Sequence, residues 1–187
     1  MATKPALQRW TYDEYARLPD DGNRYEVIAG DLHVSPSPRP RHQRALMALL
    51  APMEVFTQEH GLGTIYPGPI DLLFVQTDYL IPDAVFIRTE REGIVSVRGV
   101  EGAPDLVVEI VSPSTAMRDR GVKRDRYAHF GVSLYWVVDV ERRHVEVYRL
   151  SQNPHGPPEI ATDALVWHAV PGGPSLTLSV PHIVGAP

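Results

Sequence analysis

The 187-residue sequence contains no cysteine. This absence excludes a disulfide framework, a thiolate metal centre such as a zinc ribbon or an iron–sulfur cluster, and a cysteine nucleophile. A metal site in this chain must therefore be built from oxygen ligands or histidine. Chains without cysteine fit a reducing compartment, so we expect a cytoplasmic protein.

Long apolar runs are also missing. The longest nearly apolar stretch, ALMALLAPM at 45–53, falls far short of the roughly 18 residues that a membrane-spanning helix needs. The N-terminal segment MATKPALQRW carries charges at Lys4 and Arg9 and has no apolar centre, which is unlike a signal peptide. We therefore expect a soluble protein without a membrane partner.

Basic charge is scarce, because 18 Lys and Arg stand against 23 Asp and Glu and give a net charge of −5. This balance disfavours general attraction to nucleic acid but does not exclude a local basic patch. The segment 118–126 holds five basic and two acidic residues, and the segment 39–44 holds three arginines and a histidine. These two clusters either contact phosphate groups or form solvated helix faces with ion pairs, and both readings stay open.

The apolar pattern predicts alternating helices and strands. Residues at helical spacing predict a helix from about 41 to 60 that ends at Gly61, and a charged helix from about 116 to 130 that ends at Gly131. Short β-rich runs predict a hairpin at 25–34 and strands at 70–75, 80–88, 105–111, 134–140 and 144–150.

These elements predict an α/β (α+β) fold with a central mixed sheet, helices on its faces and extra strands toward both termini. A helix lies between the strands at 105–111 and 134–140, and this order favours parallel pairing of the two. The length fits one domain over 1–187. We expect its core at 10–150 and a peripheral C-terminal extension at 151–187.

Two acidic residues stand where apolar residues belong. Glu109 lies in the run DLVVEIV, whose pattern predicts a strand buried on both faces. Asp83 lies in the preceding predicted strand, 80–88, and shares one of its faces with Val85 and Ile87. Two carboxylates on adjacent strands that face the same way would form a hard-oxygen pocket of the kind that binds Mg²⁺. The alternative is that Asp83 is a turn residue and Glu109 forms an ion pair, and the strands alone leave both open.

Lys123 lies on the packing side of the helix that follows Glu109. A helical wheel groups it with Ala116, Asp119, Tyr127 and Phe130 and turns Arg118, Arg124 and Asp125 away. Lys123 can therefore reach back to the carboxylates. The alternative is an ordinary ion pair with Asp119, four residues earlier.

At these residues the sequence resembles the PD-(D/E)XK nuclease superfamily, and more closely its bacterial Uma-type restriction-endonuclease branch. The matching segments, in family order, are YEVIAGDL (25–32), SPSPRPRHQ (35–43), IPDAVFI (81–87), GAPDLVVEIVSPST (102–115), GVKRDRYAHFGVSLYWVVD (121–139) and VEVYRL (145–150). The resemblance implies a restriction-endonuclease-like core of helix, three strands, helix and strand. These elements would correspond to 41–60, 70–75, 80–88, 105–111, 116–130 and 134–140.

The resemblance also assigns roles to residues. It implies that Asp83 and Glu109 are catalytic metal ligands and that the backbone carbonyl of Ile110 is a third contact. The superfamily's lysine position is occupied by Val111, so the lysine role would pass to Lys123. The further site residues expected are Glu26 as an auxiliary catalytic acid, His42 as a phosphate or water contact, and Arg41 and Arg120 as substrate contacts.

The function implied is endonucleolytic hydrolysis of DNA with Mg²⁺, for which Mn²⁺ can substitute. Two other hypotheses stay open: a catalytically silent nuclease-fold module for binding or assembly, and hydrolysis of a phosphate ester outside nucleic acids. We expect a homodimer, with the apolar runs LYWVVDV and VEVYRL as its surface.

Overall fold

The computed structural model describes residues 9–19, 21–35 and 37–185. The N-terminal half contains α1 (Tyr12–Tyr15), β1 (Arg24–Ile28), β2 (Asp31–Ser35), α2 (Pro40–His60), β3 (Gly63–Pro67), β4 (Leu72–Val75), β5 (Asp78–Leu80), β6 (Ala84–Arg88), the 3₁₀ helix η1 (Thr89–Ile94), β7 (Val95–Ser96) and β8 (Gly99–Val100). The C-terminal half contains β9 (Leu106–Val111), α3 (Ala116–Arg118), the π-helical turn η2 (Asp119–Lys123), α4 (Arg124–His129), β10 (Leu134–Asp139), β11 (His144–Tyr148), β12 (Glu159–Ala161), β13 (Ala164–His168), β14 (Ser175–Ser179) and α5 (Val180–Val184).

The strands form two larger sheets and a hairpin. The main sheet has the order β12-β11-β10-β9-β6-β3, the second sheet has the order β2-β1-β5-β4-β8-β7, and β13 pairs with β14. Strands β9 and β10 are parallel, as the sequence predicted, whereas the other pairs in the main sheet are antiparallel. The predicted α+β class with a mixed sheet is therefore confirmed.

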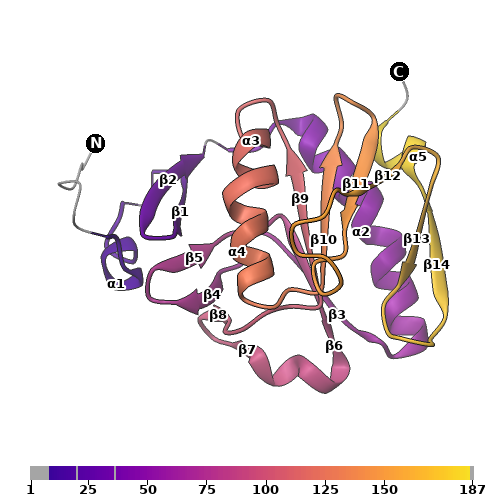
Figure 1. Ribbon diagram of the computed structural model, residues 1–187, viewed down its shortest axis with the longest axis horizontal. Helices are drawn as coiled ribbons and strands as arrows, with labels where there is room; N and C mark the ends of the chain where they lie inside the picture. The colour runs from indigo at the N-terminus through magenta and orange to yellow at the C-terminus, as the bar shows by residue number, and fades with distance from the viewer. Residues whose placement is uncertain (1–8, 20, 36, 186–187) are drawn as a thin grey trace.

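Helices cover both faces of the main sheet, so its central strands are buried. In Figure 1 the segment from α3 to α4 lies to the left of β9 and β10, and α2 runs on the other side of the sheet. All six residues of β9 are buried. The α2 side packs Leu49 and Met53 with Val108, while the α4 side packs Tyr127 with Val107. Glu109 points to the α4 side because it alternates with Val108.

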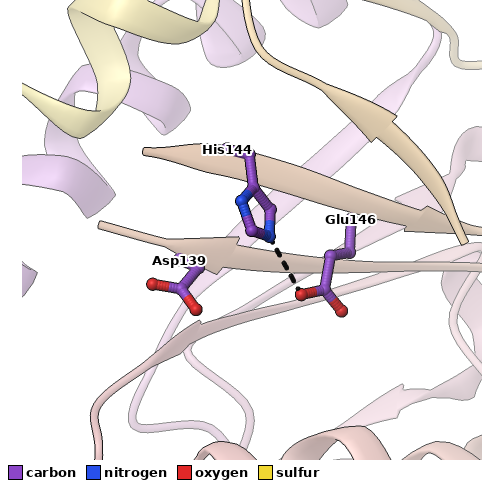
Figure 2. Close-up of side chains that lie close together, drawn as sticks. All are labelled: Asp139, His144 and Glu146. Carbon is purple, nitrogen blue, oxygen red and sulfur yellow. Dashed lines mark hydrogen bonds and ion pairs between the residues drawn. The ribbon is translucent and has the colours of Figure 1, made fainter. Parts of the chain in front are cut away.

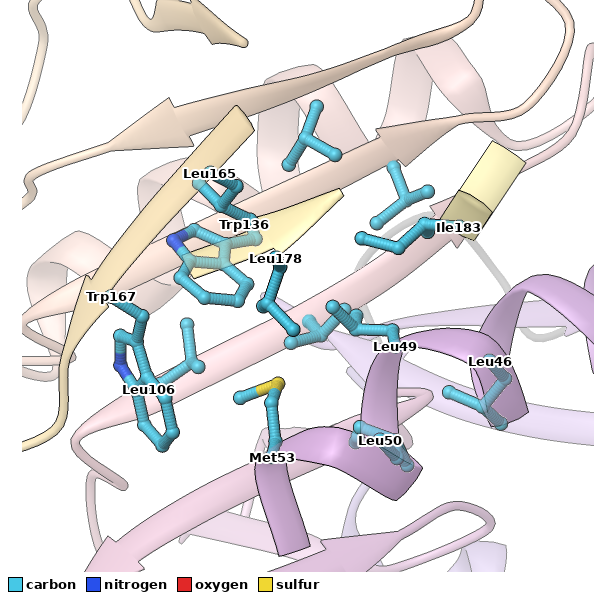
Figure 3. Close-up of a cluster of buried hydrophobic side chains, with 14 of the residues drawn as sticks. Leu46, Leu49, Leu50, Met53, Leu106, Trp136, Leu165, Trp167, Leu178 and Ile183 are labelled. Carbon is cyan, nitrogen blue, oxygen red and sulfur yellow. The ribbon is translucent and has the colours of Figure 1, made fainter. Parts of the chain in front are cut away.

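Residues after position 150, expected to form a peripheral extension, contribute to the core on the α2 side. Figure 3 shows Leu165, Trp167, Leu178 and Ile183 among the buried side chains of α2 and the main sheet. Trp167 meets Phe86 edge to face, with ring centroids 4.9 Å apart. The β13–β14 hairpin and α5 thus close a face of the core that α2 alone leaves partly open.

Two strand predictions were wrong in detail. The run 80–88 is two strands in different sheets, since β5 ends at Leu80 and β6 begins at Ala84. Pro82 has no amide hydrogen for a ladder bond, which explains the break. The run expected as the first core strand, 70–75, contains β4 of the second sheet, and β3 takes its place in the main sheet. The strand β3 begins at Gly63 and ends at Pro67, two residue types that are depleted in strands, so its sequence signal is weak.

The surface expected for a homodimer is also corrected. Tyr135, Trp136, Val137 and Val138 of β10 are buried inside the protomer, as are Val145 and Val147 of β11. These two strands therefore offer no apolar face to a second copy. Within the part of the chain that the structure describes, no helix combines the length and apolarity required to cross a membrane.

Trp167 provides a test of the C-terminal closure. Trp167→Ala should lower the free energy of unfolding by about 3–5 kcal/mol, because it removes a large side chain that is only 2 % exposed. Urea denaturation followed by circular dichroism measures the change. The matched control is Val166→Ala on the outward side of the same strand, where Val166 is 51 % exposed, and it should change stability little. Equal effects of the two substitutions would contradict the proposed packing.

Candidate active site

A cavity of about 360 Å³ opens where the two sheets meet. Its walls come from β1, from the link between β5 and β6, from the C-terminal end of β9 and from the first turns of α2 and α3. The predicted site residues that line it are Glu26, Arg41, His42, Asp83, Glu109, Ile110 and Lys123. Arg120 is the one predicted site residue outside this lining.

Asp83 lies on the link where the chain passes from the second sheet to the main sheet. It is only 4 % exposed, and its Oδ2 accepts a hydrogen bond from the Ile110 amide at 2.8 Å. Its Oδ1 accepts a 3.0 Å hydrogen bond from Arg24 and lies 3.1 Å from His42 Nε2. Burial raises the pKa of Asp83, but His42, the Ile110 amide and Arg24 outweigh it and hold the pKa below the ordinary value. Asp83 is therefore an ionised carboxylate.

Glu109 and Lys123 form a buried ion pair, with 2.5 Å between Lys123 Nζ and Glu109 Oε1. Tyr127 also donates its hydroxyl to Glu109 Oε1 at 2.7 Å. Burial raises the pKa of Glu109 well above its ordinary value, and the nearby acids add to the effect against the pull of Lys123. Burial lowers the pKa of Lys123, but the surrounding carboxylates, Glu109 first, raise it further than burial lowers it. Lys123 is therefore a permanent cation in this pocket.

Glu26 lies on β1, so it is the acidic pocket residue that the second sheet contributes. Its Oε1 accepts hydrogen bonds from Lys123 Nζ at 2.8 Å and from the Ile81 amide at 2.9 Å. Burial raises the pKa of Glu26, but Lys123, the Ile81 amide and Arg118 together lower it below the ordinary value. Lys123 thus joins β1 of one sheet to β9 of the other through two carboxylates.

The helical wheel was wrong for Arg118, which lines the pocket. Its Nη2 lies 3.5 Å from Glu26 Oε2, and it donates a hydrogen bond to the Ser35 hydroxyl at 2.8 Å. The wheel assumes 3.6 residues per turn, which places residues five apart about 140° from each other. The helix is kinked inside the segment Asp119–Lys123, because Gly121 has non-helical backbone angles (φ −104°, ψ −106°), so one wheel cannot place residues on both sides of it. Arg118 and Lys123 therefore share the pocket.

Asp119 also lines the pocket and was not among the predicted site residues. It is buried, and its Oδ1 accepts no hydrogen bond, although Arg118 Nε lies 3.7 Å away. Burial raises the pKa of Asp119 above the ordinary value. The wheel had placed Asp119 beside Lys123, and this was the signal that could have identified it.

Arg41 and Arg120 occupy different environments. Arg41 lies in the first turn of α2, is exposed, and donates a weak 3.4 Å hydrogen bond to the Val140 carbonyl. Arg120 lies in the π turn, but its guanidinium contacts Asp139 and Glu146 on the neighbouring strands. Arg41 is therefore free to meet a ligand at the rim of the pocket, whereas Arg120 is engaged within the protein.

Asp139, His144 and Glu146 form a separate cluster at the ends of β10 and β11, shown in Figure 2. One ligand atom from each lies within 4.8 Å of the others, and no other three His, Cys, Asp or Glu residues among those described do so. The guanidinium of Arg120 already contacts both carboxylates of this cluster and offsets one of their two negative charges, because its Nη2 lies 2.6 Å from both Asp139 Oδ2 and Glu146 Oε1.

Comparison with known proteins identifies the family. The family model Uma2, described as a putative restriction endonuclease, matches residues 12–181. The chain belongs to the Uma2 family. A solved structure of similar fold is a putative nuclease of the DUF820 group from Anabaena variabilis ATCC 29413, with 20% sequence identity and a TM-score of 0.74. The similarity covers 93% of this chain and 97% of that one. No curated protein matches the chain.

The donor set in the pocket of this Uma2 protein fits a hard divalent cation. It consists of carboxylates, with no thiolate in the chain, and it includes the unpaired Oδ1 of Asp119. Glu26 and Glu109 both contact the Lys123 ammonium, and Asp83 pairs with Arg24 and His42, so these three carboxylates do not converge as closely as Asp139, His144 and Glu146 do. Such a pocket suits a cation with two carboxylate ligands and several retained waters, as is usual for Mg²⁺.

Lys123 should be the largest single contributor to the stability of the pocket. Lys123→Met leaves buried carboxylates without their cation and should lower the free energy of unfolding by about 3–5 kcal/mol at pH 8. In the variant the pKa of Glu26 rises above that in the unfolded chain and the pKa of Glu109, already raised in the wild type, rises further, so the folded variant takes up protons as the pH falls. The stability deficit should therefore be smaller at pH 5 than at pH 8.

Urea denaturation at the two pH values measures this difference. The control is Arg124→Met, since Arg124 follows Lys123 in the chain but its carboxylate partner is the exposed Asp125. It should change stability by no more than about 1 kcal/mol at either pH. A Lys123→Met deficit that is the same at pH 5 and pH 8 would show that the carboxylates do not govern the loss.

Proposed function

We propose that this Uma2 protein is a Mg²⁺-dependent endonuclease that hydrolyses phosphodiester bonds of DNA, with Mn²⁺ able to replace Mg²⁺. The observation that carries the proposal is the meeting of Asp83 and Glu109 in one pocket beside the buried ammonium of Lys123. Two carboxylates can hold a divalent cation and an ammonium can offset negative charge on a phosphate, which suits metal-assisted phosphodiester hydrolysis.

Asp83, Glu109 and the backbone carbonyl of Ile110 would hold the cation. When bound, the cation would polarise the phosphate and lower the pKa of a water molecule. Asp83 suits this role because it is ionised and is fixed by the Ile110 amide. Glu109 has a raised pKa, so cation binding would displace a proton or the Lys123 contact from it.

Lys123 acts as a hydrogen-bond donor in this mechanism and not as a base. Its pKa is raised by the neighbouring carboxylates, so it remains protonated at neutral pH. It can therefore orient a water molecule or offset negative charge that develops on the phosphate. Glu26 holds the ammonium in place through a 2.8 Å hydrogen bond, which makes Glu26 an auxiliary acid of the site.

Substrate contacts are proposed for the first turn of α2. Arg41 is exposed at the rim, and His42 lies at the pocket wall with its Nε2 3.1 Å from Asp83 Oδ1. Both can donate to phosphate oxygens, which would position a DNA strand without reading its sequence. Arg120 is left out of this set because its guanidinium is engaged by Asp139 and Glu146.

The alternative function is a catalytically silent module that uses the fold for binding. One observation favours it: the pocket acids already have protein cations as partners, with Arg24 on Asp83 and Lys123 on Glu26 and Glu109. A site neutralised in this way can persist without a metal.

Asp83→Asn and Glu109→Gln should each reduce Mn²⁺ affinity in isothermal titration calorimetry. Each should also lower the rate of Mg²⁺-dependent DNA cleavage by about 100-fold or more, because the charge that binds the cation is lost. Supercoiled plasmid, single-stranded and branched DNA serve as substrates in gel assays. Asp125→Asn is the matched control, since it removes an exposed carboxylate from α4, and it should leave both quantities unchanged.

Two results would contradict the proposal. Cleavage that persists in both variants would assign the activity to another site or to a contaminant. Wild-type protein that binds no Mn²⁺ and cleaves none of the three substrates would favour the silent module.

A further inference from the structure

Arg120 makes several close contacts within the protein, unlike an arginine that is free to bind a substrate. Its Nε donates to Glu146 Oε1 at 2.8 Å, and its Nη2 lies 2.6 Å from Asp139 Oδ2 and 2.6 Å from Glu146 Oε1. The two carboxylates lie on adjacent strands of the main sheet, β10 and β11. One side chain of the π turn is therefore fastened to two strands at once.

Each oxygen of the two carboxylates that bind Arg120 already accepts a hydrogen bond. Glu146 Oε2 accepts the Tyr148 hydroxyl at 2.7 Å, and Asp139 Oδ1 accepts the Arg142 amide at 2.8 Å. The remaining two oxygens take the guanidinium of Arg120, and His144 lies 3.1 Å from Glu146 Oε1. Asp139 and Glu146, shown in Figure 2, thus form a binding site for a planar cation that donates to two carboxylates at once. The guanidinium of arginine has this geometry. We call this site the Asp139–Glu146 receptor.

The receptor lies in register with the candidate active site. Glu109 of β9 and Glu146 of β11 both lie opposite Val137 of β10, so the three residues form one row across the sheet. Residues in such a row point to the same face. Lys123 pairs with Glu109 at one end of the row, and Arg120 pairs with Glu146 at the other end.

Two parallel ion pairs therefore connect the π turn to one row of the sheet. Arg120 and Lys123 lie on either side of the kinked residue Gly121, three residues apart in the chain. With a single contact the π turn could rotate about that contact. Two contacts, one on each side of Val137, prevent this rotation of the turn relative to the sheet. A third contact, from the Tyr135 hydroxyl to the carbonyl of Asp119 at 3.0 Å, fixes the height of the turn above the sheet.

We propose that Arg120 is a positioning residue. It binds the Asp139–Glu146 receptor and thereby keeps the π turn in the position in which Lys123 contacts Glu109 and Glu26. The cluster of Asp139, His144 and Glu146 serves as this receptor and not as a second metal centre. The contribution of Arg120 to catalysis rests on the proposed function, but its anchoring of Lys123 does not and can be measured without any substrate.

The composition of the chain makes Lys123 easy to follow. The sequence has only two lysines, Lys4 and Lys123. A brief pulse of an amine-acetylating reagent, followed by peptide mass spectrometry, measures the modification rate of each lysine separately. Protein labelled with ¹³C at the lysine ε carbon gives two methylene signals, which a Lys4→Arg variant assigns. Both measurements report how firmly the Lys123 ammonium is held, with or without nuclease activity.

Arg120→Met should raise the acetylation rate of Lys123 roughly tenfold or more, because the turn opens more often once one anchor is lost. It should also move the Lys123 methylene signal toward its position in an unstructured chain. Glu146→Gln should shift both readouts in the same direction but less, and it serves as the milder variant if Arg120→Met folds poorly. The Arg120→Met, Glu146→Gln double variant should not exceed Arg120→Met alone, because both substitutions remove one contact.

Arg142→Met is the matched control. Arg142 also approaches Asp139, but at 3.9 Å and with a side chain that is 72 % exposed, and it makes no contact with the π turn. This control should leave both Lys123 readouts unchanged. Near-ultraviolet circular dichroism, which reports on buried tryptophans such as Trp136, checks that each variant keeps its core.

The outcomes separate the hypotheses. An unchanged Lys123 rate and signal in folded Arg120→Met and Glu146→Gln proteins would overturn the positioning role. Titration of the wild type with Zn²⁺ that shows binding abolished by His144→Ala would overturn the receptor assignment in favour of a metal centre. If Lys123 is released as expected but the wild type cleaves no DNA, the anchor stands and the proposed function fails. If the wild type does cleave DNA, Arg120→Met should lower kcat more than it changes KM.

Discussion

The ammonium of Lys123 is the interaction on which the candidate site depends. It is 1 % exposed and lies between Glu26 of the second sheet and Glu109 of the main sheet. Neither glutamate could remain ionised at this depth without a cation, because the desolvation of an isolated carboxylate costs several kcal/mol. One cation on one helical turn therefore supports two acids from two sheets.

Much of this arrangement could be predicted from the sequence. The alternation in DLVVEIV placed Glu109 on the buried α4 side of β9, and the helical spacing placed Lys123 toward it. These predictions concern residues within one regular element, where a period of two or of 3.6 residues fixes the direction of each side chain. The parallel pairing of β9 with β10 followed in the same way from the helix between them.

What the sequence could not predict lies where regular elements break or meet. Arg118 was assigned to the wrong side of its helix because the wheel treated 116–130 as one straight helix, whereas the backbone is kinked at Gly121. The run around Pro82 was taken as one strand because its apolar residues continue on both sides of the break. The partners of Arg120 lie 19 and 26 residues further along the chain, so the local sequence could not show that the residue expected as a substrate contact is engaged by Asp139 and Glu146.

The three-residue link Ile81–Pro82–Asp83 couples the pocket to the shape of the whole molecule. Its first amide is tied to Glu26 on one sheet, and the Asp83 amide donates to the Val108 carbonyl on the other. Because the link is short and is tied to a different sheet at each end, the junction of the two sheets sets the position of the Asp83 carboxylate, and neither sheet alone does so.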